Sequence, residues 1–302
     1  MRVVISGASG LIGTALTESL RADDHEVIAL VRRSPRGPFE SEWDPVGGVI
    51  DQDVVQSADV VVNLAGASIG DKRLTDSHKA VVKQSRVDST SLLTRAYASR
   101  TDGVLISGSA MGYYGARGEE VLTERSGPGT TFLSDIAVAW EESAAPAVDA
   151  GIRTVFIRSG LVLAPHGGFA QRLLPLVKRG FLGGLGGANA WHSWITLEDE
   201  ARAIRFLIDS DHVGPANMIA PQAVRDQDLM AALSQVVGKT PGFVVPAWAL
   251  ELAIGPAVED LLTSQNAKPG VLTRLGFEWH HPNIEDAAAW VMTEAGLAPP
   301  AM

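Results

Sequence analysis

Three glycines near the start of the chain have a spacing that suits the binding of a diphosphate. Residues 7–13 read GASGLIG, after an apolar run and before a helical pattern. Such a turn needs a residue that tolerates positive φ and a helix whose first N–H groups face the anion. The spacing differs from G-x-G-x-x-G, and a tight turn that binds nothing is the alternative. The strand–turn–helix context predicts a dinucleotide site. Its expected residues are Gly7, Ser9, Gly10, Leu11, Ile12 and Gly13.

Two arginines after the second apolar run bear on which dinucleotide is bound. A site for NAD usually has an Asp or Glu here, which holds the ribose 2′-hydroxyl. This run ends with Val31, Arg32 and Arg33, and has no carboxylate. A planar guanidinium suits the oxygens of a phosphate. We therefore expect the cofactor NADP (NADPH), with Arg32 at the 2′-phosphate and Arg33 assisting. The alternative is an ordinary pair of solvated loop arginines.

The elements that must hold these residues alternate between strands and helices. Apolar runs without polar alternation predict strands that are covered on both faces. These runs are residues 2–6, 27–31, 60–64, 104–107 and 154–157. Helical patterns lie between them, notably over residues 10–21, 75–98 and 132–149. This order predicts an α/β fold with a Rossmann-like doubly wound parallel sheet.

The pattern changes after about Arg158. Residues 167–190 are rich in glycine and predict a mobile loop or lid. Residues 194–208 resemble a strand that enters a helix returning to the first domain. Three later segments predict a small, mostly helical cap: residues 247–262, 270–275 and 284–292.

These changes divide the chain into two parts. We place an NADP-binding Rossmann domain at 1–165, with a return segment at about 191–212. A smaller C-terminal substrate or cap domain is expected at 166–302. The boundary is soft, because the chain is expected to pass between the two parts more than once.

Several segments together resemble the short-chain dehydrogenase/reductase superfamily. They are SGASGLIG (6–13), NLAG (63–66), KQSRVDST (83–90), SGSAMGYYG (107–115), the pair Trp140-Glu141, RSGLVL (158–163) and WHSWITLEDEARAI (191–204). More narrowly, the chain looks like an atypical extended member, in the branch of NAD(P)-dependent epimerase family proteins, some of which are labelled cell-division inhibitors. GFEW (276–279) is similar to the small C-terminal domain of that branch. The resemblance implies a Rossmann-type fold and an NADP-type cofactor, but no particular substrate.

The resemblance implies a role for residues 63–66, at the end of a predicted strand. In doubly wound folds, ligands bind at the carboxyl edge of the sheet. The backbone here would therefore pass near the adenosine ribose and the pyrophosphate, although a turn that merely ends the strand is the alternative. The residues concerned are Leu64, Ala65 and Gly66.

The resemblance also implies candidate catalytic residues at the next strand end. Ser109 and Tyr113 or Tyr114 would point into the crevice. A serine hydroxyl can hydrogen-bond a substrate carbonyl or hydroxyl, and a tyrosine hydroxyl can donate a proton. We expect at least one of the two tyrosines to pack under the loop instead.

The usual catalytic pair of the superfamily is missing. That pair is Tyr-x-x-x-Lys on one helical face, where the ammonium lowers the phenol pKa and holds the nicotinamide ribose. Counting back from Trp140 puts the tyrosine position near Leu133 and the lysine position near Ala137, and neither residue type occurs between residues 132 and 142. Tyr113 or Tyr114 then becomes the candidate proton donor, polarised by nearby positive charge.

Arg86 is a second departure from the superfamily. Typical extended members have an asparagine in this helix, whereas this chain reads RVDST over residues 86–90. A guanidinium here would lie within reach of the phosphates or ribose of the cofactor. We expect Arg86 to replace the missing lysine in binding the cofactor, and a surface salt bridge is the alternative.

Other kinds of site have less support. His192 could shuttle a proton, but packing with one hydrogen bond is the commoner role. Asp199 and Glu200 begin a helix and favour a capping role. The pair at 280–281 is too isolated for a metal site, the chain has no cysteine, and no metal is expected.

Composition excludes several classes of protein. The net charge of −10 and the pI near 5.2 disfavour a nucleic-acid binder, which needs a basic face. The sequence contains no run of about 18 apolar residues, so no membrane span is predicted. We expect a cytoplasmic protein with a small-molecule substrate, and the helix at 75–98 could pair two copies into a homodimer.

Two functions follow from these observations. The first is an NADP(H)-binding oxidoreductase or epimerase-like protein that acts on an unidentified small molecule without Tyr-x-x-x-Lys. The second is a catalytically silent NADP(H)-binding sensor or interaction protein, which the missing catalytic pair favours.

Overall fold

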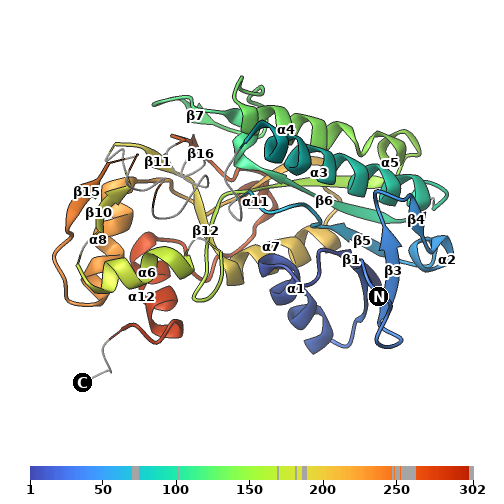
Figure 1. The fold of residues 1–302 in the computed structure, drawn as a ribbon, viewed down its shortest axis with the longest axis horizontal. Helices are drawn as coiled ribbons and strands as arrows, with labels where there is room; N and C mark the ends of the chain where they lie inside the picture. The colour runs from blue at the N-terminus through green and yellow to red at the C-terminus, as the bar shows by residue number, and fades with distance from the viewer. Residues whose placement is uncertain are drawn as a thin grey trace.

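An eight-stranded sheet forms the centre of the larger lobe (Figure 1). All its neighbouring strands run parallel, except for the antiparallel edge pair at one end. In order across the sheet, the strands are β13 (Gly214–Met218), β8 (Arg153–Ser159), β6 (Val104–Ala110), β5 (Val60–Asn63), β1 (Arg2–Ser6), β2 (Glu26–Val31), β3 (Glu40–Asp44) and β4 (Val49–Ile50). The computed structural model describes residues 1–69, 75–100, 102–168, 170–180, 182–185, 189–246, 248, 252 and 263–298.

Helices cover both faces of this sheet. Figure 1 shows α3 (Asp76–Tyr97), α4 (Phe132–Glu142) and α5 (Ala145–Asp149) above it, with α1 (Leu11–Ala22) and α7 (Leu197–Asp209) below it. Val3 and Val4 explain why, because successive strand residues point to opposite faces and both are fully buried. Val3 packs with residues of α1 and α7, and Val4 packs with residues of α3 and α5. The predicted fold class, a doubly wound Rossmann-like sheet, is confirmed.

Side-chain caps mark where several helices begin. Thr75, Thr131, Thr196 and Asn283 each precede a helix and accept a hydrogen bond from a backbone N–H of its first turn. The cap of α7 is therefore Thr196. Asp199 and Glu200 lie in the first turn of α7, as expected, but neither caps it, because both carboxylates are fully buried and hydrogen-bonded elsewhere.

Most predicted elements of the first half are found. All five predicted strands are confirmed, but β13 at one edge of the sheet and the pair β3 and β4 at the other were not predicted. The helix predicted over 132–149 is two helices, because α4 ends at Glu142 and α5 begins at Ala145 with a proline in its first turn. Proline has no N–H to continue the helical hydrogen bonds.

A smaller lobe packs beside the sheet (Figure 1). Its helices α8 (Asp226–Val236) and α12 (Ile284–Glu294) share a core with Trp194. The mobile loop predicted at 167–190 is wrong in the described part, which forms α6 (Ala170–Lys178) and β10 (Leu182–Leu185). Leu174 and Val177 lie three residues apart and are buried in a core that they share with α8. This packing stabilises α6, although glycines lie on both sides of it.

The C-terminal region contributes to both lobes. Val271 and Leu272 of α11 (Gly270–Leu275) pack in the core under the sheet, together with Phe277. The next helix, α12, belongs to the smaller lobe. The helix predicted at 247–262 falls almost wholly outside the described residues. The domain boundary near residue 165 stays a prediction.

Candidate functional site

The order of the strands creates a gap between two sets of loops. From β1 the chain proceeds outward through β2 and β3, whereas β5 and β6 lie on the other side of β1. Loops that leave β1 and β5 therefore diverge at the carboxyl edge, where doubly wound sheets bind ligands. A cavity of about 1130 Å³ lies there, between these loops, the end of β2 and the helix α3.

Eight of the predicted cofactor residues line this cavity, and four do not. The lining residues are Gly7, Ser9, Gly10, Arg32, Arg33, Leu64, Ala65 and Gly66. Leu11, Ile12, Gly13 and Arg86 are not among the residues that line it. The cofactor contacts of all twelve residues stay predictions.

Gly7 and Gly13 meet steric demands in the glycine-rich turn. Gly7 has φ +72°, and a Cβ there would lie 2.7 Å from the carbonyl carbon of Leu64. A Cβ on Gly13 would collide with the carbonyl oxygen of Gly7. The N–H of Gly10 donates to that same oxygen at 2.9 Å, which closes the turn. These contacts bring the backbone of the turn against the loop that follows β5.

The start of α1 has no side-chain cap. Its N-cap is Gly10, which has no side chain to satisfy the first N–H groups of the helix. These N–H groups have no acceptor inside the helix and lie at the positive end of its dipole. A diphosphate in the cavity would supply the missing acceptors.

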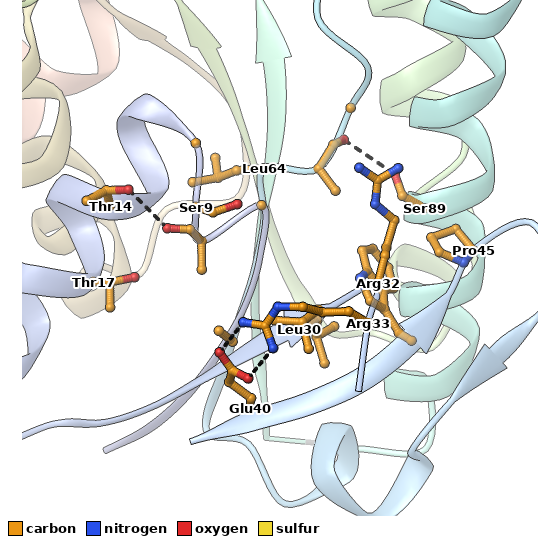
Figure 2. Close-up of a pocket in the computed structure, with 18 of the residues that line it drawn as sticks. Ser9, Thr14, Thr17, Leu30, Arg32, Arg33, Glu40, Pro45, Leu64 and Ser89 are labelled. Atoms are coloured by element: carbon orange, nitrogen blue, oxygen red, sulfur yellow. Dashed lines mark hydrogen bonds and ion pairs between the residues drawn. The ribbon is translucent and has the colours of Figure 1, made fainter. Parts of the chain in front are cut away.

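The two adjacent arginines take different directions (Figure 2). Arg33 donates to both carboxylate oxygens of Glu40, at 2.7 and 2.6 Å. Hydrogen bonds from Arg33 and from the N–H of Arg36 lower the pKa of Glu40 to about 2. Arg32 extends towards α3 near Ser89, and makes no hydrogen bond or ion pair with the part of the chain that the structure describes.

Arg86 stabilises elements beside the cavity and does not line it. Its Nη1 donates to the carbonyl oxygens of Ala67 and Val82, both at 3.0 Å. Its guanidinium lies 4.8 Å from the ring centre of Trp140, on α4. A Cβ on Gly66 would lie 3.0 Å from the guanidinium carbon of Arg86, so the glycine lets the loop approach. Arg86 thus connects α3, α4 and the loop after β5.

Asn63 is a positioning residue that sequence reasoning missed. Its Oδ1 accepts from Ser6 Oγ at 2.6 Å, and its Nδ2 donates to Thr90 Oγ1 at 2.7 Å. These buried bonds connect the ends of β1 and β5 to α3. Asn63 occurs in the NLAG motif, but its partners come from distant segments.

A second polar cluster lies at the end of β6, between the sheet and α4. Arg158 of β8 is 3% exposed and forms a two-bond ion pair with Glu141 of α4, with both distances 2.8 Å. Although burial lowers the pKa of Arg158, hydrogen bonds and charge from Glu141 outweigh it and raise that pKa above the ordinary value. Ser109 Oγ donates to the same carboxylate at 2.7 Å. The proton of the Ser109 hydroxyl is thereby used inside the protein.

The two tyrosines occupy different environments. Tyr114 is fully buried, and its hydroxyl donates to Asn217 Oδ1 at 2.7 Å and accepts from Arg158 at 2.9 Å. Burial raises the pKa of Tyr114 to about 12, against the charge of Arg158. Tyr113 is half-buried, with its ring centre 3.5 Å from the guanidinium carbon of Arg158. Its hydroxyl has no hydrogen-bond partner among the described residues, so Tyr113 is the better placed of the two to meet a substrate.

The helix α4, where the usual catalytic pair of the superfamily was sought, is apolar at both positions. Leu133 and Ala137 of α4 are buried, at 6% and 1% exposed. Ser134 beside them donates to the carbonyl oxygen of Gly112, which ties α4 to the turn that carries the tyrosines. This helix therefore contributes packing in place of a phenol and an ammonium.

The remaining ionisable candidates have structural partners. His192 contacts Asp226 at 3.1 Å, and both side chains are buried. The rings of His280 and His281 contact the carboxylate of Glu198. Among the residues that the structure describes, no group of three or more metal-binding side chains occurs. The same residues include no helix with the length and apolarity to cross a membrane.

The fold and the cavity together define a Rossmann-type nucleotide-binding protein. The model of the NAD dependent epimerase/dehydratase family matches residues 3–219, and a domain of unknown function (DUF1731) matches residues 245–291. The chain belongs to the NAD dependent epimerase/dehydratase family. The resemblance inferred from the motifs is thereby confirmed, including the small C-terminal region.

Relatives and solved structures agree with this assignment. An epimerase family protein of Mycobacterium bovis is 39% identical over 296 residues, which cover 97% of this chain and 98% of the relative. A crystal structure of human epimerase family protein SDR39U1 with NADPH has a TM-score of 0.87 and 26% identity, and covers 97% of this chain and 99% of that one.

A larger structural relative and a more distant one have the same fold. A nucleoside-diphosphate sugar epimerase from Corynebacterium glutamicum is 35% identical with a TM-score of 0.78, and the match covers 100% of this chain but 59% of that one. A UDP-glucose 4-epimerase of Thermus thermophilus in complex with NAD, at 20% identity and a TM-score of 0.74, shows the fold alone.

Proposed function

We propose that the chain binds NADP(H) in the cavity beside the glycine-rich turn and uses it in oxidoreductase or epimerase chemistry on a small molecule. The observation that carries the cofactor choice is the end of β2, where Arg32 follows Val31 and the sequence has no Asp or Glu before Glu40. Arg32 lines the cavity without an ion pair among the described residues, so its charge is available to a phosphate. The human relative crystallised with NADPH supports the same choice.

The residues around the cavity fit such a cofactor. Gly7 and Gly10 would bring the backbone close to a diphosphate, and the open N–H groups of α1 would bind its oxygens. Leu64, Ala65 and Gly66 would lie beside the adenosine ribose.

The experiment that tests the cofactor is a titration of the purified protein with NADPH and with NADH. We expect NADPH to bind at least tenfold more tightly, because a charge-assisted contact to a phosphate contributes about 1.5–3 kcal/mol. Equal or tighter binding of NADH would contradict the proposal.

The catalytic part of the proposal assigns the proton transfer to Tyr113. A bound nicotinamide supplies or accepts a hydride, so the protein must orient the substrate and supply or remove a proton. The hydroxyl of Tyr113 is free for this, and the guanidinium of Arg158 holds its ring. The Ser109 hydroxyl donates its hydrogen bond to Glu141, and its oxygen would accept a hydrogen bond from a substrate hydroxyl.

Phenylalanine substitutions test this assignment. Loss of NADPH absorbance would be followed over a panel of carbonyl compounds. The active compound would then be used to assay Tyr113→Phe and Tyr114→Phe. Tyr113→Phe should reduce turnover by about 100-fold or more, since general acid catalysis contributes about that much. Undiminished turnover in Tyr113→Phe would remove this tyrosine from the mechanism.

The second candidate function is a catalytically silent NADP(H) sensor or interaction protein. Leu133 and Ala137 favour it, because they leave α4 without the usual phenol and ammonium. Tight cofactor binding with no turnover over the whole panel, together with recovery of a protein partner, would support this function over the first.

The remaining expectations concern partners and place. A small-molecule substrate, the absence of nucleic-acid and membrane binding, pairing of two copies through α3, and a cytoplasmic location all remain predictions. Size-exclusion chromatography with light scattering would test the pairing of two copies.

A further inference from the structure

The adjacent arginines at the cavity differ in their ion pairing. Arg33 faces a carboxylate, and its positive charge is balanced by Glu40 at 2.6 Å. Arg32 lines the same cavity, and none of its atoms forms an ion pair with a described residue. Because the two residues share one loop and one cavity, the difference comes from Glu40.

Glu40 is held firmly in position. It is the first residue of β3, and the parallel pairing of β3 with β2 places it opposite Ala29. Its two oxygens accept three hydrogen bonds, two from Arg33 and one from the N–H of Arg36. The loop between β2 and β3 is thereby closed around the carboxylate. These bonds keep the pKa of Glu40 low, so the group is ionised at every pH near neutrality.

A doubly charged phosphate would meet different fields at the two arginines. Near Arg33 the attraction of the guanidinium is opposed by the carboxylate of Glu40, which lies at hydrogen-bond distance from it. None of the described carboxylates is paired with the guanidinium of Arg32. The side chains also diverge, with Arg33 turned to Glu40 and Arg32 turned towards Ser89 (Figure 2).

We propose that Glu40 is a specificity-determining residue, which withholds Arg33 from the 2′-phosphate and leaves Arg32 to bind it. This inference rests on the proposed function, the binding of NADP(H) in this cavity. It differs from the expectation that Arg33 assists Arg32. Glu40 thereby moderates the preference for NADPH over NADH, and its removal strengthens that preference.

Dissociation constants of NADPH and NADH for matched variants test this inference. Glu40→Gln keeps the shape and an acceptor for the N–H of Arg36, but removes the charge. We expect it to tighten NADPH binding about two- to fivefold, the size of an exposed charge–charge contact, and to leave NADH binding unchanged. Arg32→Ala should weaken NADPH binding about tenfold or more, and Arg33→Ala should change the NADPH/NADH ratio less than about twofold.

The double variant Glu40→Gln/Arg33→Ala is the control. The gain of Glu40→Gln should vanish in it, because released Arg33 is the source of that gain. Thermal unfolding of each variant checks that the loop still folds, and Glu40→Ala gives a second removal of the charge.

Several results would overturn the inference. They are weaker NADPH binding in both folded Glu40 variants, an equal gain for NADH, or a gain that survives in the double variant. If the unchanged protein binds neither coenzyme, the proposed function fails and the inference fails with it. Selective NADPH binding with no response to Glu40→Gln overturns the inference alone.

Discussion

The cavity beside the glycine-rich turn and the polar cluster at the end of β6 use charged side chains in different ways. In the cavity, the ion pair of Arg33 and Glu40 is exposed and joins residues only seven positions apart. In the polar cluster at the end of β6, Arg158 is 3% exposed, and its partners come from α4 and from the turn after β6. Exposed pairs contribute little to stability, whereas a buried pair becomes costly once one partner is removed. We therefore predict that the charges in the cavity contribute to ligand selection, whereas the buried charges at the end of β6 stabilise the fold.

The same substitution in both regions gives the largest predicted difference. Arg158→Met removes one partner of the buried pair, so that Glu141 keeps only the hydrogen bond from Ser109 and the hydroxyl oxygen of Tyr114 loses its donor. We expect the free energy of unfolding to fall by about 3–5 kcal/mol. Arg33→Met should leave it nearly unchanged. Urea denaturation of both variants measures the difference, and equal effects would contradict the division of roles.

Glycine substitutions probe the cavity from its backbone. Gly13→Ala places a Cβ against the carbonyl oxygen of Gly7, so the turn must shift at a cost of about 1–3 kcal/mol in stability. The shift should also weaken NADPH binding. Gly10→Ala is the milder control, because its Cβ would lie 3.2 Å from the same oxygen. Thermal unfolding and NADPH titration of both variants test the order, and a larger effect of Gly10→Ala would contradict it.

Two glutamates extend the comparison to pH. Burial raises the pKa of Glu200 to about 8, although Ser159 donates a hydrogen bond to it, whereas contact with Arg33 lowers that of Glu40 to about 2. The folded chain therefore keeps a proton on Glu200 that the unfolded chain has released. Stability falls as pH rises from about 4.5, the ordinary value, to about 8. For Glu40 the sign is opposite, since its contribution is present above about 4.5 and is lost as pH falls to about 2.

Glu200→Gln isolates the buried group. The slope that Glu200 contributes is at most about 1.4 kcal/mol per pH unit. We expect the variant to lose this slope between about pH 4.5 and 8, and to gain stability relative to the unchanged protein at pH 8. Urea denaturation across this range measures it, and an unchanged slope would contradict the assignment.

The two regions also differed in how far the sequence could predict them. The glycine-rich turn and Arg32 lie within one strand–turn–helix–strand unit, where local spacing decides which residues meet. The polar cluster at the end of β6 joins Ser109, Glu141 and Arg158, which come together only when β6, α4 and β8 pack. Glu141 was noted as a motif residue, but no local pattern could assign its partners. Glu40 was missed because β3, the strand next to the edge, has no apolar run.

The smallest effect concerns the two tyrosines. Tyr114→Phe removes a hydroxyl that joins Arg158 to Asn217, so two buried polar groups lose a partner and stability should fall by about 1–2 kcal/mol. Tyr113→Phe should leave stability unchanged, since its hydroxyl has no partner among the described residues. Turnover should respond in the reverse order if Tyr113 transfers the proton. A Tyr113 variant that loses stability as much as the Tyr114 variant would place both tyrosines in the structural cluster and leave the proposed reaction without a proton donor from this turn.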